Sequence, residues 1–168
     1  MKIVVCPLDS VQSLVHETRA ASVVSLLGPE SPHRVFNGID GARHLKLTFH
    51  DIVEPIPGFM APQPEHAERI IGFVRGWDKK MPMIIHCFAG ISRSTAAAYT
   101  AMCLLNPKAD EFELAWHLRE ASPIATPNRL IVSHADALLG RDGRMSAAIE
   151  EIGRGEEAFE GVPFSLKI

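Results

Sequence analysis

The sequence predicts an α/β protein built on an open, mostly parallel sheet of about 4–5 strands, with helices covering both faces. Two observations predict this class. Short apolar, partly β-branched runs alternate with helical patterns in the first part of the chain, and the later part is helical throughout. The length of 168 residues allows one substantial core, so we expect a single domain spanning residues 1–168.

Four apolar runs have the length and composition of buried or half-buried strands. In chain order, they are Ile3–Cys6, Ala21–Leu27, Leu45–Phe49 and Met83–His86. Six stretches show helical patterns. They are Asp9–Arg19, Pro64–Trp77, Ser94–Leu105, Asp110–Ala121, Pro127–Leu139 and Met145–Gly153. The residues from Gly153 onward are expected to be partly ordered and exposed.

The segment Glu54–Pro64 contains four prolines and cannot hold a regular element. It is predicted to be a long loop, not a domain linker, because a strand and a helix follow it. Long loops in compact domains are often functional. The strand that precedes this loop should end at the edge of the sheet where open α/β sheets bind ligands.

Composition excludes several classes of protein. A net charge of −3 gives no reason to expect nucleic acid or an anionic membrane as a partner, and no apolar run has the length of a membrane span. The N-terminal apolar run is too short for a signal peptide. Three cysteines fit a reducing, cytoplasmic location. No His/Cys cluster has metal-ligand spacing, so we expect neither a metal nor a cofactor. The sequence does not indicate an oligomeric state.

The most specific pattern in the chain is the segment His86–Thr95, which lies between the apolar run Met83–Ile85 and an Ala-rich helical stretch. A strand that turns through a small-residue loop into a helix directs backbone N–H groups and the helix dipole at one point, which attracts anions. Arg93 adds a planar fork that can bind two phosphate oxygens. The positive electrostatic potential of these groups also favours the nucleophilic thiolate form of Cys87. This arrangement indicates displacement at phosphorus.

The spacing His86-Cys87-x5-Arg93-Ser94 resembles the signature of the cysteine-dependent protein tyrosine phosphatases, closest to the dual-specificity, bacterial tyrosine-phosphatase-like branch. The resemblance covers about residues 44–139. It implies a phosphotyrosine-phosphatase-like fold and phosphomonoester hydrolysis through a phosphocysteine intermediate, with Cys87 as nucleophile. The phosphate-binding loop that it implies consists of Phe88, Ala89, Gly90, Ile91, Ser92 and Arg93.

The resemblance also implies roles for three neighbouring residues. Ser94 matches the hydroxyl that hydrogen-bonds the cysteine sulfur and eases its departure. His86 matches the residue that orients the loop and assists thiolate formation. Asn128 ends a Pro-x-x-x-Pro-Asn stretch, in which the Asn supports the phosphate loop. This last pattern is also typical of a helix start, with Thr126 as N-cap and Pro127 at the first helical position.

Expelling a tyrosine or serine oxygen requires a proton donor. The run Leu45–Asp51 resembles the segment that ends in the general acid of the dual-specificity branch, which makes Asp51 the first candidate. Glu54 is the reserve candidate, and a simple solvated turn residue is the alternative for Asp51. The neighbouring His50 is expected to be structural or exposed.

The other two cysteines are expected to play different parts. Cys103 lies in an apolar helical stretch and is expected in the core. Cys6 ends the first strand, and if that strand is parallel to the one before Cys87, a reversible disulfide between Cys6 and Cys87 is a further hypothesis.

The leading hypothesis for function is phosphatase activity, most favoured on phosphotyrosine and extending to dual specificity, with a phosphorylated protein or a small phosphomonoester as substrate. The loop lacks the lysines of phosphoinositide phosphatases. The alternative is a catalytically weak or inactive module that binds phosphorylated partners. A third class, sulfur or arsenate chemistry at Cys87, is disfavoured by Ser94 and by the Pro-Asn stretch.

Overall fold

The computed structural model describes all 168 residues. The strands are β1 (Lys2–Pro7), β2 (Ser22–Leu27), β3 (His44–Thr48), β4 (Met83–Cys87) and β5 (Phe164–Lys167). The helices are α1 (Val11–Thr18), α2 (Pro64–Arg75), α3 (Arg93–Leu105), α4 (Glu111–Ala121), α5 (Arg129–Leu139) and α6 (Arg144–Ile152). The predicted strands and helices are all present, with bounds that differ by at most two residues.

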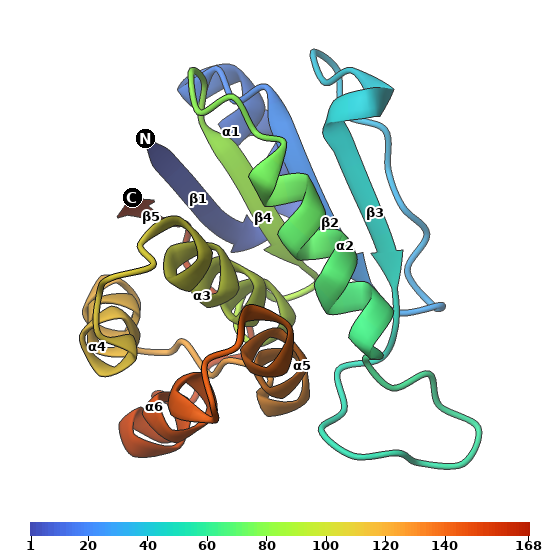
Figure 1. Cartoon of the computed structure of the whole chain (residues 1–168). Coiled ribbons are helices and arrows are strands. Elements are labelled where there is room, and N and C mark those ends of the chain that lie inside the picture. Colours follow the sequence, from blue (N-terminus) through green and yellow to red (C-terminus); the bar gives the residue numbers. More distant parts are fainter.

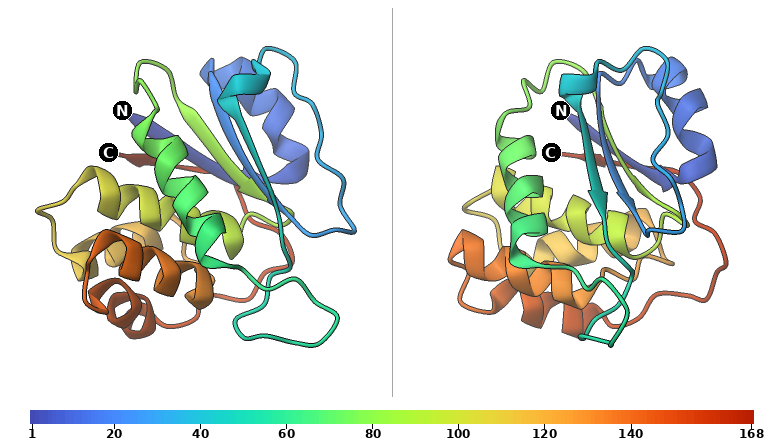
Figure 2. Two further views of the ribbon diagram at one scale, coloured as in Figure 1. Left: turned by 45° about the vertical axis from the view of Figure 1, so that its right-hand side comes forward. Right: turned by 90° about the vertical axis from the view of Figure 1, so that its right-hand side faces the viewer.

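The five strands form one sheet in the order β3-β2-β4-β1-β5 (Figure 1). β1 to β4 are mutually parallel, and β5 runs antiparallel to β1. Helix α1 covers one face of the sheet, while α2 and α3 cover the other and carry α4, α5 and α6 as a further layer (Figure 2). The predicted class, an open and mostly parallel sheet with helices on both faces, is therefore confirmed.

Two apolar clusters form the core on the two faces of the sheet. The larger one packs the sheet against α2, α3 and the outer helices, and the smaller one packs it against α1. Helix α3 is buried from Arg93 to Cys103, because its alanines let the sheet and the neighbouring helices approach closely. The start of α3 is therefore a rigid platform. No helix combines the length and apolar character needed to cross a membrane.

The C-terminal part of the chain differs from expectation. Residues after Gly153 are not merely an exposed tail, because they end in β5, which pairs with the edge strand β1. β5 has only four residues, and Leu166 is the only one of them that is fully buried. In so short a run, the alternation of apolar and polar residues is too brief to distinguish a strand from a loop. β5 satisfies the backbone groups along the outer edge of β1.

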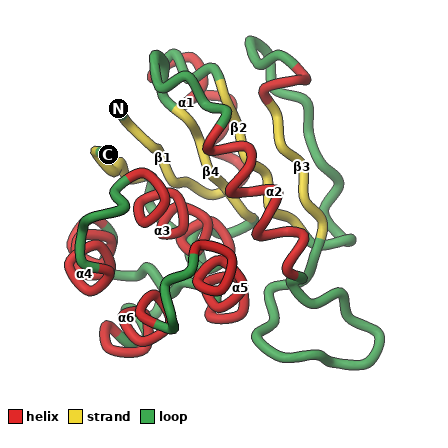
Figure 3. Tube along the Cα trace, in the orientation of Figure 1, coloured by secondary structure: helices red, strands yellow, loops and turns green.

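Two helix starts lie two residues later than expected. Helix α5 begins at Arg129, and its N-cap is Asn128, whose side-chain oxygen accepts hydrogen bonds from the N–H groups of Leu130 and Ile131 at 3.1 Å each. The alternative with Thr126 as N-cap is therefore wrong. Helix α1 begins at Val11, after a 3-10 turn. Figure 3 shows the long loop between β3 and α2 that the prolines predicted.

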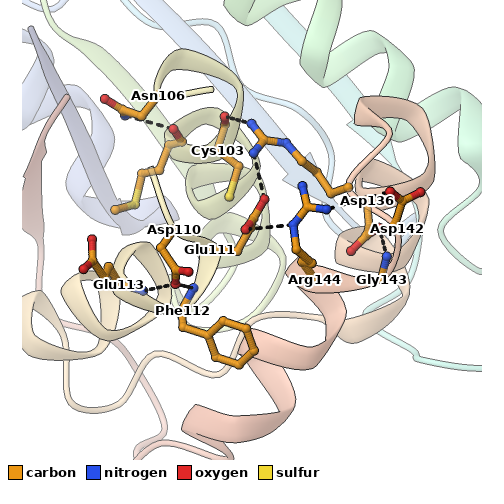
Figure 4. A network of polar contacts seen from close by, with 12 residues as sticks. Cys103, Asn106, Asp110, Glu111, Phe112, Glu113, Asp136, Asp142, Gly143 and Arg144 are labelled. Carbon is orange, nitrogen blue, oxygen red and sulfur yellow. Dashed lines mark hydrogen bonds and ion pairs between the residues drawn. The ribbon is translucent and has the colours of Figure 1, made fainter. Parts of the chain in front are cut away.

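An ion pair with a buried carboxylate joins the start of α4 to the start of α6 (Figure 4). Glu111 is 4% exposed and accepts hydrogen bonds from Arg141 at 2.7 Å and from Arg144 at 3.2 Å. Arg141 also donates to the carbonyl of Cys103 at 2.7 Å. Burial by itself raises the pKa of Glu111, but the hydrogen bonds from Arg144, from its own backbone and from Arg141 outweigh it, so the net pKa is lowered.

We expect Glu111→Gln to lower the free energy of unfolding at pH 7 by about 3 kcal/mol, because it leaves buried arginine charge without its partner. Urea denaturation measures this. Since the folded-state pKa of Glu111 is lowered, its contribution is complete above its unfolded pKa of about 4.3 and disappears as the pH falls through the folded value. The free energies of unfolding of the wild type and of Glu111→Gln should therefore converge at acid pH. Exposed Glu113→Gln in the same helix turn is the control, and equal losses for both variants would contradict the assignment.

Candidate active site

The segment Cys87–Arg93, here called the phosphate loop, lies at the edge where the parallel strands end. Cys87 is the last residue of β4, and Arg93 is the first residue of α3. The loop therefore joins the carboxyl end of a central strand to the N-terminus of a buried helix, as the sequence pattern predicted. That N-terminus supplies a positive electrostatic potential.

Four carbonyl groups of the phosphate loop point outward and accept hydrogen bonds from surrounding backbone N–H groups. The pairs, donor first, are Leu8–Phe88 at 3.1 Å, Gly161–Ala89 at 2.7 Å, Thr126–Ile91 at 3.0 Å and Asn128–Ser92 at 3.2 Å. In a trans peptide, the C=O and the following N–H point in opposite directions. Holding these carbonyls outward therefore turns amide N–H groups of the loop inward, and Gly90 N–H donates to Cys87 Sγ at 3.2 Å.

Gly90 is required at its position for two reasons. Its φ is +74°, in the left-handed region that side chains rarely adopt. A Cβ at this position would also lie 2.7 Å from the backbone nitrogen of Pro7 and 2.8 Å from the carbonyl carbon of Cys6. The phosphate loop thus packs directly on the end of β1, with no room for a side chain.

The sulfur of Cys87 lies 3.2 Å from Ser94 Oγ, and both side chains are buried. A serine hydroxyl and a backbone amide at hydrogen-bonding distance both stabilise negative charge on sulfur. The structure therefore places the Ser94 hydroxyl at hydrogen-bonding distance from the Cys87 sulfur, as the resemblance implied.

Arg93 is 6% exposed and donates from Nη1 to the carbonyl of Phe49 at 2.9 Å. Its Nε is buried and has no hydrogen-bond partner in the protein. A buried guanidinium nitrogen without a partner is costly unless an acceptor binds it. An oxyanion seated in the loop is a suitable acceptor, because a guanidinium can bind two of its oxygens at once.

Asp51 contacts the phosphate loop, whereas Glu54 does not. One carboxylate oxygen of Asp51 accepts hydrogen bonds from Ser92 Oγ at 2.7 Å and from Asn128 Nδ2 at 2.8 Å. Asn128 also donates to the carbonyl of Ile52 at 3.1 Å. Glu54 is exposed and makes no hydrogen bond. Asn128 thus joins the phosphate loop, helix α5 and the segment that carries Asp51.

His86 contacts the backbone of Cys87, not its sulfur. Its Nδ1 lies 3.1 Å from the Cys87 carbonyl, so Nδ1 carries the proton and donates, and Nε2 accepts from Ser25 Oγ at 2.5 Å. Ser25 in turn lies 2.8 Å from His44 Nε2. Burial lowers the pKa of His86 to about 4. A neutral imidazole in this place orients the loop and supplies no positive charge to the thiolate, which departs from the second role implied for His86.

Cys6 and Cys87 lie on neighbouring strands but belong to different faces of the sheet. Cys6 packs in the cluster under α1, and Cys87 packs in the cluster under α3. In the parallel register, Cys6 is level with His86. Because alternate side chains of a strand point to opposite faces, the hypothetical Cys6–Cys87 disulfide would require one strand to turn over. Burial also raises the pKa values of Cys6 and Cys103 to about 12.

A cleft of about 720 Å³ opens beside the phosphate loop. Its lining includes Asp51, Ser92 and Asn128, together with Arg129 and Arg154. No group of three or more His, Cys, Asp and Glu side chains is arranged to hold a metal ion. Sequence reasoning missed Ser25, the Phe49 carbonyl and Gly161. They support the loop through contacts between distant segments, for which the sequence carries no local signal.

Several solved structures with a similar fold are phosphatases. DUSP15 aligns over 92% of this chain and 94% of its own, with a TM-score of 0.56 and 20% identity. Human DUSP28 aligns over 83% and 92%, with a TM-score of 0.62 and 13% identity. The chain has the dual-specificity phosphatase fold. The human tyrosine phosphatase-like serine/threonine/tyrosine-interacting protein also shares it, with a TM-score of 0.58, 15% identity and coverage of 83% and 92%. No protein-family profile and no curated protein sequence matches the chain.

In this phosphatase fold, we expect Gly90→Ala to weaken binding of tungstate, a phosphate analogue, by about tenfold or more, since left-handed strain alone costs about 1–2 kcal/mol and the new methyl group also displaces the loop from β1. Titration calorimetry measures the affinity. Gly72→Ala is the matched control, because Gly72 lies in α2 with open space around its Cβ position. Unchanged tungstate affinity in Gly90→Ala would show that the loop tolerates another shape.

Proposed function

We propose that the protein hydrolyses phosphomonoesters through a phosphocysteine intermediate, with protein phosphotyrosine as the most favoured substrate. The observation that carries this proposal is the position of Cys87 Sγ inside a loop in which four outward carbonyls are held by N–H groups of other segments. Such a loop presents inward N–H groups to an oxyanion without rearranging, which is the main source of electrostatic catalysis. The buried Nε of Arg93 supports the same interpretation.

In the first step, the Cys87 thiolate attacks phosphorus, and the bond from phosphorus to the ester oxygen breaks. The loop amides and the Arg93 guanidinium bind the three remaining phosphoryl oxygens, whose charge changes during transfer. The leaving oxygen takes the proton of Asp51, which is the candidate acid in contact with the loop. The products of this step are the free alcohol or phenol and a phosphocysteine.

In the second step, water attacks the phosphocysteine, and Asp51 accepts a proton from that water. The sulfur–phosphorus bond breaks, inorganic phosphate is released and Cys87 returns to the thiolate. The hydroxyl of Ser94, 3.2 Å from the sulfur, donates a hydrogen bond to the departing thiolate and makes it a better leaving group. Asn128 holds Asp51 and the phosphate loop together throughout.

A phosphoprotein is favoured over an inositol lipid as the substrate. One solved structure of this fold is PTPMT1 in complex with PI(5)P, which is 13% identical to this chain, with a TM-score of 0.55 and coverage of 88% of each chain. Here, however, the residues between Cys87 and Arg93 include no lysine to bind additional phosphates. The loop instead exposes the aromatic ring of Phe88. A free catalytic thiol persists best in a reducing compartment, which favours the cytoplasm.

The second candidate function is a module that binds phosphorylated partners without turnover. It is favoured by one specific observation: a structural neighbour is named a tyrosine phosphatase-like interacting protein. The same loop that stabilises a transition state would also bind a phosphate in its ground state. Release of inorganic phosphate from a phosphotyrosine peptide separates the two functions.

We expect Cys87→Ser to abolish turnover, with a loss of at least about 10³-fold, because an alcohol at neutral pH is a far weaker nucleophile than a thiolate. Tungstate affinity should stay within about threefold of the wild-type value, because the loop amides and Arg93 are unchanged. Steady-state assays and calorimetry provide the two measurements. Substantial remaining turnover in this variant would remove Cys87 from the role of nucleophile.

We expect Asp51→Asn to lower turnover of phosphotyrosine by about 10²–10⁴-fold. The tyrosine phenol has a pKa near 10, so it leaves poorly without a proton. An aryl phosphate with a much more acidic phenol should lose far less. Glu54→Gln is the matched control and should leave both rates unchanged, since Glu54 does not contact the loop. Equal, small losses for Asp51→Asn on the two substrates would transfer the role to Glu54 or favour the binding module.

A further inference from the structure

We propose that His50 is the positioning residue for Asp51: its imidazole closes the loop of residues 51–59 at the base and thereby holds Asp51 against the phosphate loop. This inference rests on the proposed function, in which Asp51 is the proton donor. The loop projects from the body of the protein between β3 and the start of α2 (Figure 1). Its two ends meet at His50 and Met60.

Two hydrogen bonds join these two residues. The N–H of His50 donates to the carbonyl of Met60 at 2.8 Å, and the N–H of Met60 donates to Nδ1 of His50 at 2.9 Å. The second bond requires an unprotonated Nδ1, so Nε2 carries the ring proton. Nε2 faces Glu30 Oε2 at 3.7 Å, and the Phe59 ring packs edgewise on the imidazole with 4.9 Å between ring centroids.

The middle of the loop has no other attachment. Residues 53–58 make no hydrogen bond with the rest of the protein, and almost all of the loop is exposed, including the apolar side chains of Val53, Ile56 and Phe59. Without packing of its own, the loop takes its position from its ends. Its first residue, Asp51, is held by Ser92 and Asn128, and its two ends are joined by the hydrogen bonds between His50 and Met60.

Three consecutive residues of this segment thus each make a different contact. The carbonyl of Phe49 fixes Arg93, the side chain of His50 closes the loop, and the carboxylate of Asp51 reaches Ser92. Phe49 is fully buried, so the chain direction is already set before His50. What remains free is the direction of the peptide after His50, which the hydrogen bonds to Met60 determine. A misplacement of about 1 Å in a catalytic group costs up to about 10²-fold in rate.

Three substitutions separate the hydrogen bond from the bulk of the ring. His50→Asn keeps an acceptor, Oδ1, at the place of Nδ1. His50→Gln places its amide near the position of Nε2 and lacks that acceptor, and His50→Leu lacks both. His117→Leu is the control, because His117 is an exposed histidine on α4 with no hydrogen bond. Thermal unfolding of each variant confirms that the fold is intact.

The decisive readout is the dependence of kcat on the leaving group. We expect His50→Leu and His50→Gln to lower kcat for phosphotyrosine by about 10- to 100-fold, and for an aryl phosphate with an acidic phenol by less than about threefold. His50→Asn should restore most of the phosphotyrosine rate. If the role of His50 were merely structural, kcat would fall equally for both substrates, and His50→Asn would not restore it.

Hydrogen exchange of the Met60 amide tests the closure independently of turnover. We expect faster exchange in His50→Leu and His50→Gln than in the wild type or in His50→Asn. Equal Met60 exchange in all variants, equal losses on both substrates, or His50→Asn behaving like His50→Leu would each overturn the assignment of His50. A wild-type protein that releases no phosphate would instead refute the proposed function, whatever the Met60 amide shows.

Discussion

The orientation of the peptide groups in the phosphate loop is the constraint on which the rest of the site depends. Amide groups converge on one point only if their carbonyls are bound elsewhere, because inward carbonyls would repel an anion. Here those outward acceptors are satisfied by three separate segments: Leu8 just after β1, the Thr126–Asn128 turn that leads into α5, and the C-terminal stretch at Gly161. The anion site is therefore a property of the whole sheet edge and not of the loop sequence alone.

The same edge explains why the candidate acid and the carbonyl that holds Arg93 come from one short stretch of chain. β3 ends beside β2, and the residues that follow it reach the N-terminus of α3 from the side opposite to β1. Phe49, His50 and Asp51 each serve a different partner there. A shift of β3 along the sheet would displace all three contacts together, so the register of β3 against β2 is as important to the site as the signature itself.

Much of this arrangement could be predicted from the sequence, because its signals are local. Cys87 and Arg93 stand at fixed spacing between an apolar strand and an Ala-rich helix, and the prolines after Asp51 mark the long loop. What could not be predicted depends on contacts between distant segments. β5 carries too few alternating residues to be recognised, and Gly161 and His50 act through backbone groups of partners far away in the chain or across a loop. The neutral state of His86 follows from burial, which a sequence pattern does not report.

The position of β5 also has a consequence for the order of folding. β5 joins the sheet by pairing with β1, so that Lys2 lies opposite Lys167, and the Gly161 bond to the Ala89 carbonyl lies on the same stretch of chain. Contacts between residues so far apart in sequence close the largest loops and form late. The central parallel strands and α3 can assemble first, with the phosphate loop in place but one of its outward carbonyls unbound. The anion site is therefore complete only when β5 has docked, because Gly161 lies on the stretch of chain that leads into β5.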